Sequence, residues 1–372
     1  MNEKLKGLLD FLEENIDIDH VNEVEKLHLD AIKYKEVPYL PLSFLCPPEE
    51  EFLPFPYADA YDNPEKMLYN ELLCSFSSSV NSVRIKDHFP LQIRSNHGVG
   101  IISSLFGVKC RIINDNMPWV DHFDKEEEIV KKIENGVPEL NYALGYKVLQ
   151  THQYYLETLR EYPKCYRAIH ITQPDLQGPF DIAHLLVGPK IFYDLCDNPG
   201  FIHSLLGLVT ETYIRFRKLL QPYLTDEAGE DAVFVLGSVY GGKVVIKDDT
   251  AAINLSPEMY NEFSKQYNEK IFEAFGKGSL HHCGQERPWH FSSFACENLA
   301  GINYGNPEMH ELKKTYDYWS RRKVPILWWG CSQEHGFLDE VYRLDIKTGM
   351  SLTTKANTVE DAKKLLRKHV ER

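Results

Sequence analysis

The spacing of apolar residues predicts a helical start to the chain. Residues 4–34 carry leucine and valine at intervals of three and four, with Asp19 available as a cap between two helices. Residues 37–64 are instead dense in proline, phenylalanine and tyrosine, which favours an extended segment lying over a larger body. We therefore expect residues 1–85 to form a helical and extended N-terminal segment that packs on the rest of the protein.

From about residue 86 onwards, short apolar runs alternate with amphipathic helical patterns. The helices are the clearer elements. Ser256 precedes Pro257 at one helix start, and apolar residues then recur every fourth position up to Phe275. Thr358 and Asp361 mark the start of a final helix. The apolar runs between the helices are predicted as strands over residues 90–94, 110–113, 168–172, 232–236, 243–246, 279–283, 301–304 and 325–329.

Strands that alternate with helices at this period are typical of a parallel sheet with both faces covered. A (β/α)8 barrel and a doubly wound sheet both satisfy the pattern. The Gly-x-Gly-x-x-Gly fingerprint of dinucleotide-binding folds does not follow these strands, which favours the barrel. We therefore predict an α/β protein in which residues 86–372 form a (β/α)8 TIM barrel with an N-terminal helical extension. Its chemistry is expected where the strands end.

Composition narrows the classes of partner. The 372 residues include 41 Lys and Arg against 55 Asp and Glu, a net charge of −14, so nucleic acid and anionic membranes are not expected partners. Apolar runs such as 101–108 are far shorter than the roughly 20 residues of a membrane span. The chain start lacks the pattern of a secretion signal, and the 8 cysteines are scattered. We expect a cytoplasmic protein with reduced thiols.

A histidine and a cysteine two residues apart offer the sharpest candidate chemistry. Alternate side chains of a strand share a face, so His281 and Cys283 should point the same way and His282 the opposite way. Imidazole and thiolate on one face suit Zn²⁺. The alternative is a core histidine beside a buried thiol. Cys331 follows another predicted strand end, and together with the pair it would give three ligands with an open fourth position, as in catalytic zinc sites.

Several polar residues follow the other predicted strand ends. Asp248 and Asp249 are candidate catalytic carboxylates, although adjacent acids after a strand also serve as caps or remain solvated. Asp175 and Gln177 either contact a substrate or form a turn. Arg94, Asn96 and His97 are further candidates for substrate or cofactor binding, because they precede Gly98 near a helix start, where anions are favoured. Gln285 and Tyr304 are the remaining candidates.

The segment Leu280-His281-His282-Cys283-Gly284 resembles the Leu-His-x-Cys-Gly zinc motif of corrinoid-dependent methyltransferases, a branch of the uroporphyrinogen decarboxylase superfamily that includes the methylcobamide:coenzyme M enzymes. Segments 175–183, 195–206, 248–260 and 301–308 follow in the order of the superfamily, so the resemblance runs from about residue 85 to the C-terminus. It implies a (β/α)8 barrel with its cavity at the strand ends. It also implies a zinc-dependent methyltransferase acting between a small-molecule methyl donor or thiol acceptor and a corrinoid (cobalamin), and we expect the corrinoid to be carried on a separate partner protein.

The sequence leaves two other functions possible, and it also leaves the identity of the third zinc ligand open. True uroporphyrinogen decarboxylases carry arginines in an N-terminal loop that bind carboxylates, whereas residues 41–60 contain no arginine. A decarboxylase-like carboxy-lyase acting on another substrate is therefore the second interpretation, and a barrel that serves only as a binding subunit is the third. In the methyltransferase branch the second cysteine lies further past the last strand than Cys331 does. Glu334, His335 or a purely packing role for Cys331 are the alternatives there.

Overall fold

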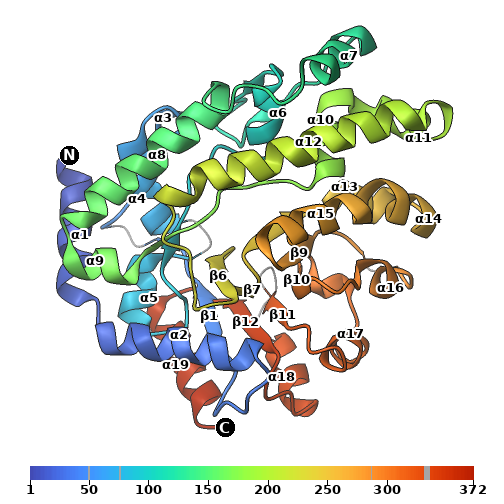
Figure 1. The fold of residues 1–372 in the computed structure, drawn as a ribbon. Coiled ribbons are helices and arrows are strands. Elements are labelled where there is room, and N and C mark those ends of the chain that lie inside the picture. Colours follow the sequence, from blue (N-terminus) through green and yellow to red (C-terminus); the bar gives the residue numbers. More distant parts are fainter. Residues whose placement is uncertain (49–50, 75–76, 286, 331–335) are drawn as a thin grey trace.

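Eight short parallel strands form a barrel whose inner and outer faces are both covered. The computed structural model describes residues 1–48, 51–74, 77–285, 287–330 and 336–372. Figure 1 shows the helices surrounding the strands, with the long helices on one side of them. The barrel strands are β1 (Leu42–Leu45), β2 (Gln92–Ile93), β5 (His170–Ile171), β8 (Val244–Lys247), β9 (Gly278–His282), β10 (Leu299–Tyr304), β11 (Ile326–Trp329) and β12 (Met350–Lys355).

The order of the strands around the barrel follows the order of the chain. Six of them form one parallel sheet in the order β1, β12, β11, β10, β9 and β8, and β2 pairs with β5 in parallel. A parallel bridge between Gln177 and Lys247 joins the segment after β5 to β8. On the other side, the His88 N–H donates to the Leu42 carbonyl oxygen of β1 at 3.1 Å. The architecture is TIM-barrel-like, as the sequence pattern predicted.

Helices fill the connections between the strands. The N-terminal part contains α1 (Glu3–Asn15), α2 (Ile18–Ile32), α3 (Tyr57–Tyr61), α4 (Pro64–Cys74) and α5 (Ser79–Ile85). Between β2 and β8 lie α6 (Ile101–Leu105), α7 (Glu126–Asn135), α8 (Ala143–Arg160), α9 (Pro163–Ala168), α10 (Pro179–Val187), η1 (Gly188–Lys190), α11 (Ile191–Asp197), α12 (Pro199–Leu220) and η2 (Gln221–Tyr223). After β8 come α13 (Asp249–Asn254), α14 (Pro257–Tyr260), the π-helical η3 (Asn261–Lys265), α15 (Gln266–Phe275), α16 (His290–Phe294), η4 (Pro307–Met309), α17 (Leu312–Ser320), α18 (Gly336–Arg343) and α19 (Val359–Val370).

Helix caps confirm two of the predicted boundaries and correct a third. The Ser256 side chain accepts from the Met259 N–H at the start of α14, and the Thr358 side chain accepts from the Asp361 N–H at the start of α19. At the start of α2, however, the cap is Asp17, whose carboxylate accepts from the His20 N–H. The expectation that Asp19 caps this helix was therefore wrong by two residues.

Two of the predicted barrel strands lie outside the barrel. Residues 110–113 contribute β3 (Cys110–Arg111), which pairs antiparallel with β4 (Trp119–Val120). Residues 232–236 contribute β6 (Ala232–Val235), which pairs antiparallel with β7 (Ser238–Gly241). The turn between β6 and β7 has φ 47° at Leu236 and φ 82° at Gly237, the conformation of a tight two-residue hairpin. Apolar periodicity identified these strands but could not reveal their partners.

The β6–β7 hairpin fills part of the barrel interior. Its buried side chains form an apolar cluster with Val245 of β8 and Leu327 of β11. The Ser279 hydroxyl of β9 donates to the Gly241 carbonyl oxygen at 2.7 Å, which fixes the hairpin near the start of the barrel strands. The interior at this end is therefore an apolar plug, and space for polar chemistry remains at the ends of the strands.

The two barrel strands that the sequence did not reveal are β1 and β12, which pair with each other from Leu42 opposite Leu352 to Leu45 opposite Lys355. Strand β1 lies within the proline-rich and aromatic segment that predicted an extended cover. Strand β12 carries Ser351 and Thr353 at buried positions, which weakens its apolar pattern. The predicted division at residue 85 thus needs correction, because the barrel sheet takes one strand from residues 1–85.

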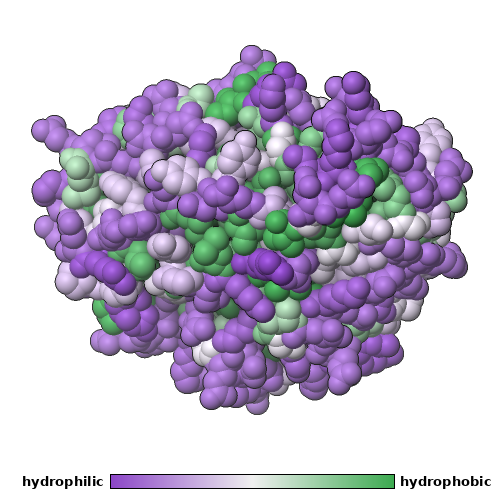
Figure 2. Space-filling model, turned by 45° about the horizontal axis from the view of Figure 1, so that its top comes forward, coloured by the Kyte–Doolittle hydropathy of each residue, from purple (hydrophilic) through white to green (hydrophobic). Residues whose placement is uncertain are grey.

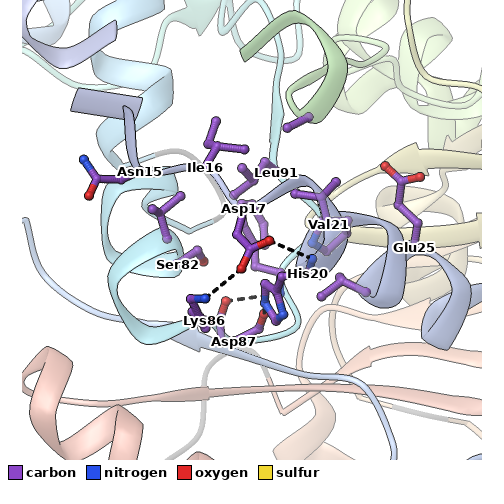
Figure 3. Close-up of a pocket in the computed structure, with 15 residues that line it drawn as sticks. Asn15, Ile16, Asp17, His20, Val21, Glu25, Ser82, Lys86, Asp87 and Leu91 are labelled. Carbon is purple, nitrogen blue, oxygen red and sulfur yellow. Dashed lines mark hydrogen bonds and ion pairs between the residues drawn. The ribbon is translucent and has the colours of Figure 1, made fainter. Parts of the chain in front are cut away.

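The surface is mostly hydrophilic, with hydrophobic residues gathered in a band across the middle of the face seen in Figure 2. In the described ranges, no helix has the combined length and apolar character that crossing a membrane would require. A crevice of about 30 Å³ between α2 and α5 has a mainly apolar lining, and the Asp17–Lys86 ion pair of 2.8 Å lies beside it (Figure 3). This volume suits about one water molecule. The lining contains none of the predicted site residues.

An ion-pair network fastens the N-terminal helices to the barrel. Glu25 of α2 accepts hydrogen bonds of 3.0 Å from Arg167 and from His170, the first residue of β5. Burial raises the pKa of Glu25, but the hydrogen bonds from His170 and Arg167 outweigh it and hold this pKa at about 2, below the ordinary 4.5. A carboxyl group with a depressed folded-state pKa stabilises the fold above its unfolded pKa.

We therefore expect Glu25→Gln to lower the free energy of unfolding at pH 7 by an amount on the order of 1–3 kcal/mol. The contribution of Glu25 is complete above pH 4.5 and disappears as the pH falls towards 2, so the variant should lose less stability than the wild type over that interval. Urea unfolding at a series of pH values measures this. Glu23→Gln, at an exposed position of the same helix, is the control. The prediction would be contradicted if the free energy of unfolding depended on pH in the same way for the wild type and for Glu25→Gln.

Candidate metal centre and its surroundings

The register of three neighbouring strands places polar side chains in one layer inside the barrel. Lys247 of β8 lies opposite His281 of β9, and His281 lies opposite Asn303 of β10. Residues in register on parallel strands share a face. That face is the interior, because Val245 and Leu327 share it and contact the β6–β7 plug. We call Lys247, His281 and Asn303 the inward layer.

Three potential metal ligands meet at the ends of β8 and β9. The ligand atoms of Asp249, His281 and Cys283 all lie within 4.8 Å of one another. His281 Nε2 is 3.4 Å from Cys283 Sγ and 3.7 Å from Asp249 Oδ1. The Cys283 N–H donates to Asp249 Oδ1 at 2.6 Å, which holds the carboxylate beside the thiol. The predicted His281 and Cys283 pair is thus brought together with Asp249, one of the two predicted catalytic carboxylates.

The environment favours a neutral imidazole at this position. Burial lowers the pKa of His281, the carboxylate of Asp249 acts in the opposite direction, and the Lys247 ammonium lowers it further. A neutral imidazole is the form that binds metals. Nitrogen, sulfur and carboxylate oxygen are the three ligand types that Zn²⁺ accepts in proteins.

Gly305 leaves room beside this cluster. A Cβ atom at position 305 would lie 2.5 Å from Cys283 Sγ and 3.2 Å from the Cε1 atom of His281. Any larger residue would therefore push against two of the three ligand side chains. The absence of a side chain here fits a cluster that must keep space for an ion.

A charged cluster lies next to the three ligands. Asp175 forms ion pairs with Lys247 (2.7 Å) and Arg94 (3.3 Å), and the Gln177 amide donates to the same carboxylate at 3.0 Å. Burial raises the pKa of Asp175, but Lys247 and Arg94 together bring it well below its usual range. Asp175 and His281 are also coupled electrostatically. The structure thus brings together three of the predicted binding residues, Arg94, Asp175 and Gln177, and adds Lys247.

Asp248 does not share the position of Asp249. Its carboxylate is fully buried and accepts hydrogen bonds of 2.6 to 2.9 Å from Tyr260, Ser264 and Asn268, which lie in the helical layer. Adjacent residues leave a strand on opposite sides, so only Asp249 can reach the inward side. The structure therefore does not bring Asp248 together with the ligand cluster, and its predicted catalytic role remains a prediction.

Asp181, which the sequence analysis passed over, lies close to both of these acids. Its Oδ1 atom accepts from the Thr250 N–H at 2.7 Å. Burial, followed by the charges of Asp248 and Asp249, raises the pKa of Asp181 well above its ordinary value. Burial and the two neighbouring carboxylates thus make Asp181 harder to ionise than an exposed aspartic acid.

Tyr304 points away from the inward layer. It lies opposite His282 in the β9–β10 register, one position beyond the pair formed by His281 and Asn303. Its hydroxyl accepts from Trp319 Nε1 at 2.7 Å, and its ring lies 5.1 Å from that of His282. The structure therefore does not bring Tyr304 into the inward layer, because alternation along β10 directs Asn303 into the barrel instead.

The other predicted residues have different surroundings. The backbone carbonyl of Asn96 accepts from the Tyr57 hydroxyl at 2.9 Å. His97 is buried with its ring 5.3 Å from that of Tyr61, and burial lowers its pKa to about 4. Gln285 is exposed. These contacts place His97 in packing rather than in the ligand cluster.

Three residues from the sequence analysis lie outside the described residues. They are Cys331, the predicted third zinc ligand, and its alternatives Glu334 and His335. Their roles remain predictions. The residues that sequence reasoning missed are Lys247, Asn303 and Gly305. The two-residue spacing that places His281 and Cys283 on one face of a strand can be read from the sequence. The residues of the neighbouring strands that complete the site follow only from the strand register.

The fold has a counterpart among solved structures. No protein-family model matches the chain, and neither does any curated sequence. A methyltransferase from Methanosarcina mazei has a similar structure, with a TM-score of 0.66 and 16% sequence identity over 94% of this chain and 98% of that chain. The comparison confirms the barrel-like fold over nearly the full length of both chains.

The separation of the two adjacent acids leads to a direct test. Asp248→Asn should lower the free energy of unfolding by about 1–3 kcal/mol, because three buried donors lose their charged acceptor. Asp249→Asn should change stability little but weaken Zn²⁺ binding roughly tenfold or more. Urea unfolding and metal titration of each variant measure the two effects. Loss of metal binding in Asp248→Asn alone would reverse the assignment of the two acids.

Proposed function

We propose that the protein is a zinc-dependent methyltransferase that moves a methyl group between a small molecule and a corrinoid carried on a separate protein in the cytoplasm. The observation that carries the proposal is the convergence of Asp249, His281 and Cys283 at the strand ends of the barrel. The fold it shares with the methyltransferase from Methanosarcina mazei supports the same reaction class.

The residues present fit a zinc ion. Asp249, His281 and Cys283 supply the ligand atoms, and Gly305 leaves space beside two of them. When bound, zinc would lower the pKa of a thiol or polarise the heteroatom that carries the methyl group. Partial burial of His281 and Cys283 limits the access of water to this point while leaving it open to a reactant.

The neighbouring charges would orient the small molecule. Arg94 and Lys247 contribute two positive charges, and the carboxylates of Asp175 and of Glu71, whose Oε2 accepts from the Arg94 N–H, lie beside them. Fixed charges of both signs at this point can orient a polar reactant. Asp175 holds the two cationic side chains in place, and Gln177 in turn holds Asp175.

The first test is the metal content. We expect one zinc per chain by elemental analysis and roughly 100-fold weaker zinc binding in Cys283→Ala, because a thiolate ligand is lost. Cys196→Ala, at an exposed cysteine, is the matched control and should bind zinc as the wild type does. Chelation should leave the circular dichroism spectrum unchanged, since a core of this size folds without metal. Full zinc occupancy in Cys283→Ala would contradict the site, and Cys331→Ser tests the further predicted ligand.

The second test is the transfer itself. With methylcobalamin and a panel of thiols, or with reduced cobalamin and methylated alcohols, amines, aryl ethers and thioethers, the zinc-loaded protein should change the visible spectrum of the corrinoid. Cys283→Ala should lower the rate by at least about 100-fold, and Cys196→Ala should leave it unchanged. Decarboxylation of a porphyrinogen without any corrinoid reaction would instead support the carboxy-lyase interpretation.

A further inference from the structure

Asn303 connects the candidate ligand His281 to the next strand of the barrel. It is buried, and it lies in register with His281 on one side and with Leu327 on the other. Its Nδ2 atom donates to the Leu327 carbonyl oxygen at 2.6 Å, and its Oδ1 atom forms a short hydrogen bond with His281 Nδ1. One amide side chain therefore spans the distance between β9 and β11.

The Leu327 carbonyl determines which way the amide of Asn303 faces. A carbonyl oxygen can only accept, so the NH₂ group must face Leu327, and Oδ1 must face His281. Because Oδ1 can only accept, the hydrogen of the shared bond belongs to His281 Nδ1. A neutral imidazole carries one hydrogen, so the lone pair is left on Nε2. That atom lies 3.4 Å from Cys283 Sγ and 3.7 Å from Asp249 Oδ1.

We infer that Asn303 is a positioning residue that holds His281 in the Nδ1–H tautomer and directs the Nε2 lone pair at Cys283 and Asp249. This inference rests on the proposed function in one respect, since Nε2 is the atom that would bind the zinc. Metal-binding histidines generally donate their other ring N–H to a fixed acceptor, and here an amide locked by a backbone carbonyl supplies it. Asn303 acts only through His281 and contacts no reactant.

The tautomer can be measured without metal or activity. In protein labelled with ¹⁵N-histidine and freed of metal, long-range ¹H–¹⁵N spectra should show His281 with a protonated Nδ1 and an unprotonated Nε2. The His281→Gln variant assigns the signals. Asn303→Leu removes the acceptor and should give a mixture of tautomers, whereas Asn303→Asp retains an acceptor and should keep the Nδ1–H form. Thr353→Val, at a buried polar position elsewhere in the barrel, is the control for burial alone.

Zinc binding gives the second measurement. Asn303→Leu should weaken zinc binding roughly 10- to 100-fold, and Asn303→Asp should restore most of the loss. A wild-type His281 with hydrogen on Nε2, or an Asn303→Leu variant with unchanged tautomer and zinc affinity, would overturn the inference. If Asn303→Leu does not fold, the tautomer of His281 in the wild type and in Asn303→Asp still tests the inference. A wild type with the expected tautomer but no zinc affinity would refute the proposed function and leave the role of Asn303 intact.

Discussion

The candidate site depends on the register between β8, β9 and β10. Because Lys247, His281 and Asn303 occupy equivalent positions on neighbouring parallel strands, their side chains enter the barrel at the same height. A shift of one of these strands by one residue towards its end would replace its polar residue in the layer by the apolar residue that precedes it, which is Ile246, Leu280 or Ile302. Both the hydrophobic core and the chemistry are therefore set by the same pairing.

The interior of the barrel is divided along its axis. The β6–β7 hairpin brings its apolar side chains against Val245 and Leu327, so the half of the barrel where the strands begin is filled with hydrocarbon. The polar side chains lie on the other side of this plug, where the strands end. Charged side chains buried there must pair with one another, as Asp175 does with Lys247 and Arg94, because the apolar side chains beneath them offer no polar partner. The plug thus strengthens the electrostatic coupling around the ligand cluster.

Alternation along the strands also explains how residues adjacent in sequence came to have different roles. Asp248 anchors α14, η3 and α15 to β8 through hydrogen bonds from three side chains, whereas Asp249 lies beside Cys283. The His282 ring packs against Phe294 of α16, and the Tyr304 hydroxyl accepts from Trp319 of α17. His281 and Asn303 instead form a hydrogen bond inside the barrel. In each pair one residue holds the helices on the sheet, and the other belongs to the site.

The sequence by itself determined the class of fold, six of the eight barrel strands, and the His281 and Cys283 pair, because these depend on local periods of two and four residues. It could not distinguish hairpin strands such as β6 from barrel strands, since both are apolar and only their partners differ. It missed β12, where buried Ser351 and Thr353 interrupt the apolar pattern. The tertiary structure alone decided that Lys247, Asn303 and Asp175 surround His281. These residues come from different strands and loops, and their proximity results from strand register, which is a relation between distant segments rather than a property of any one of them.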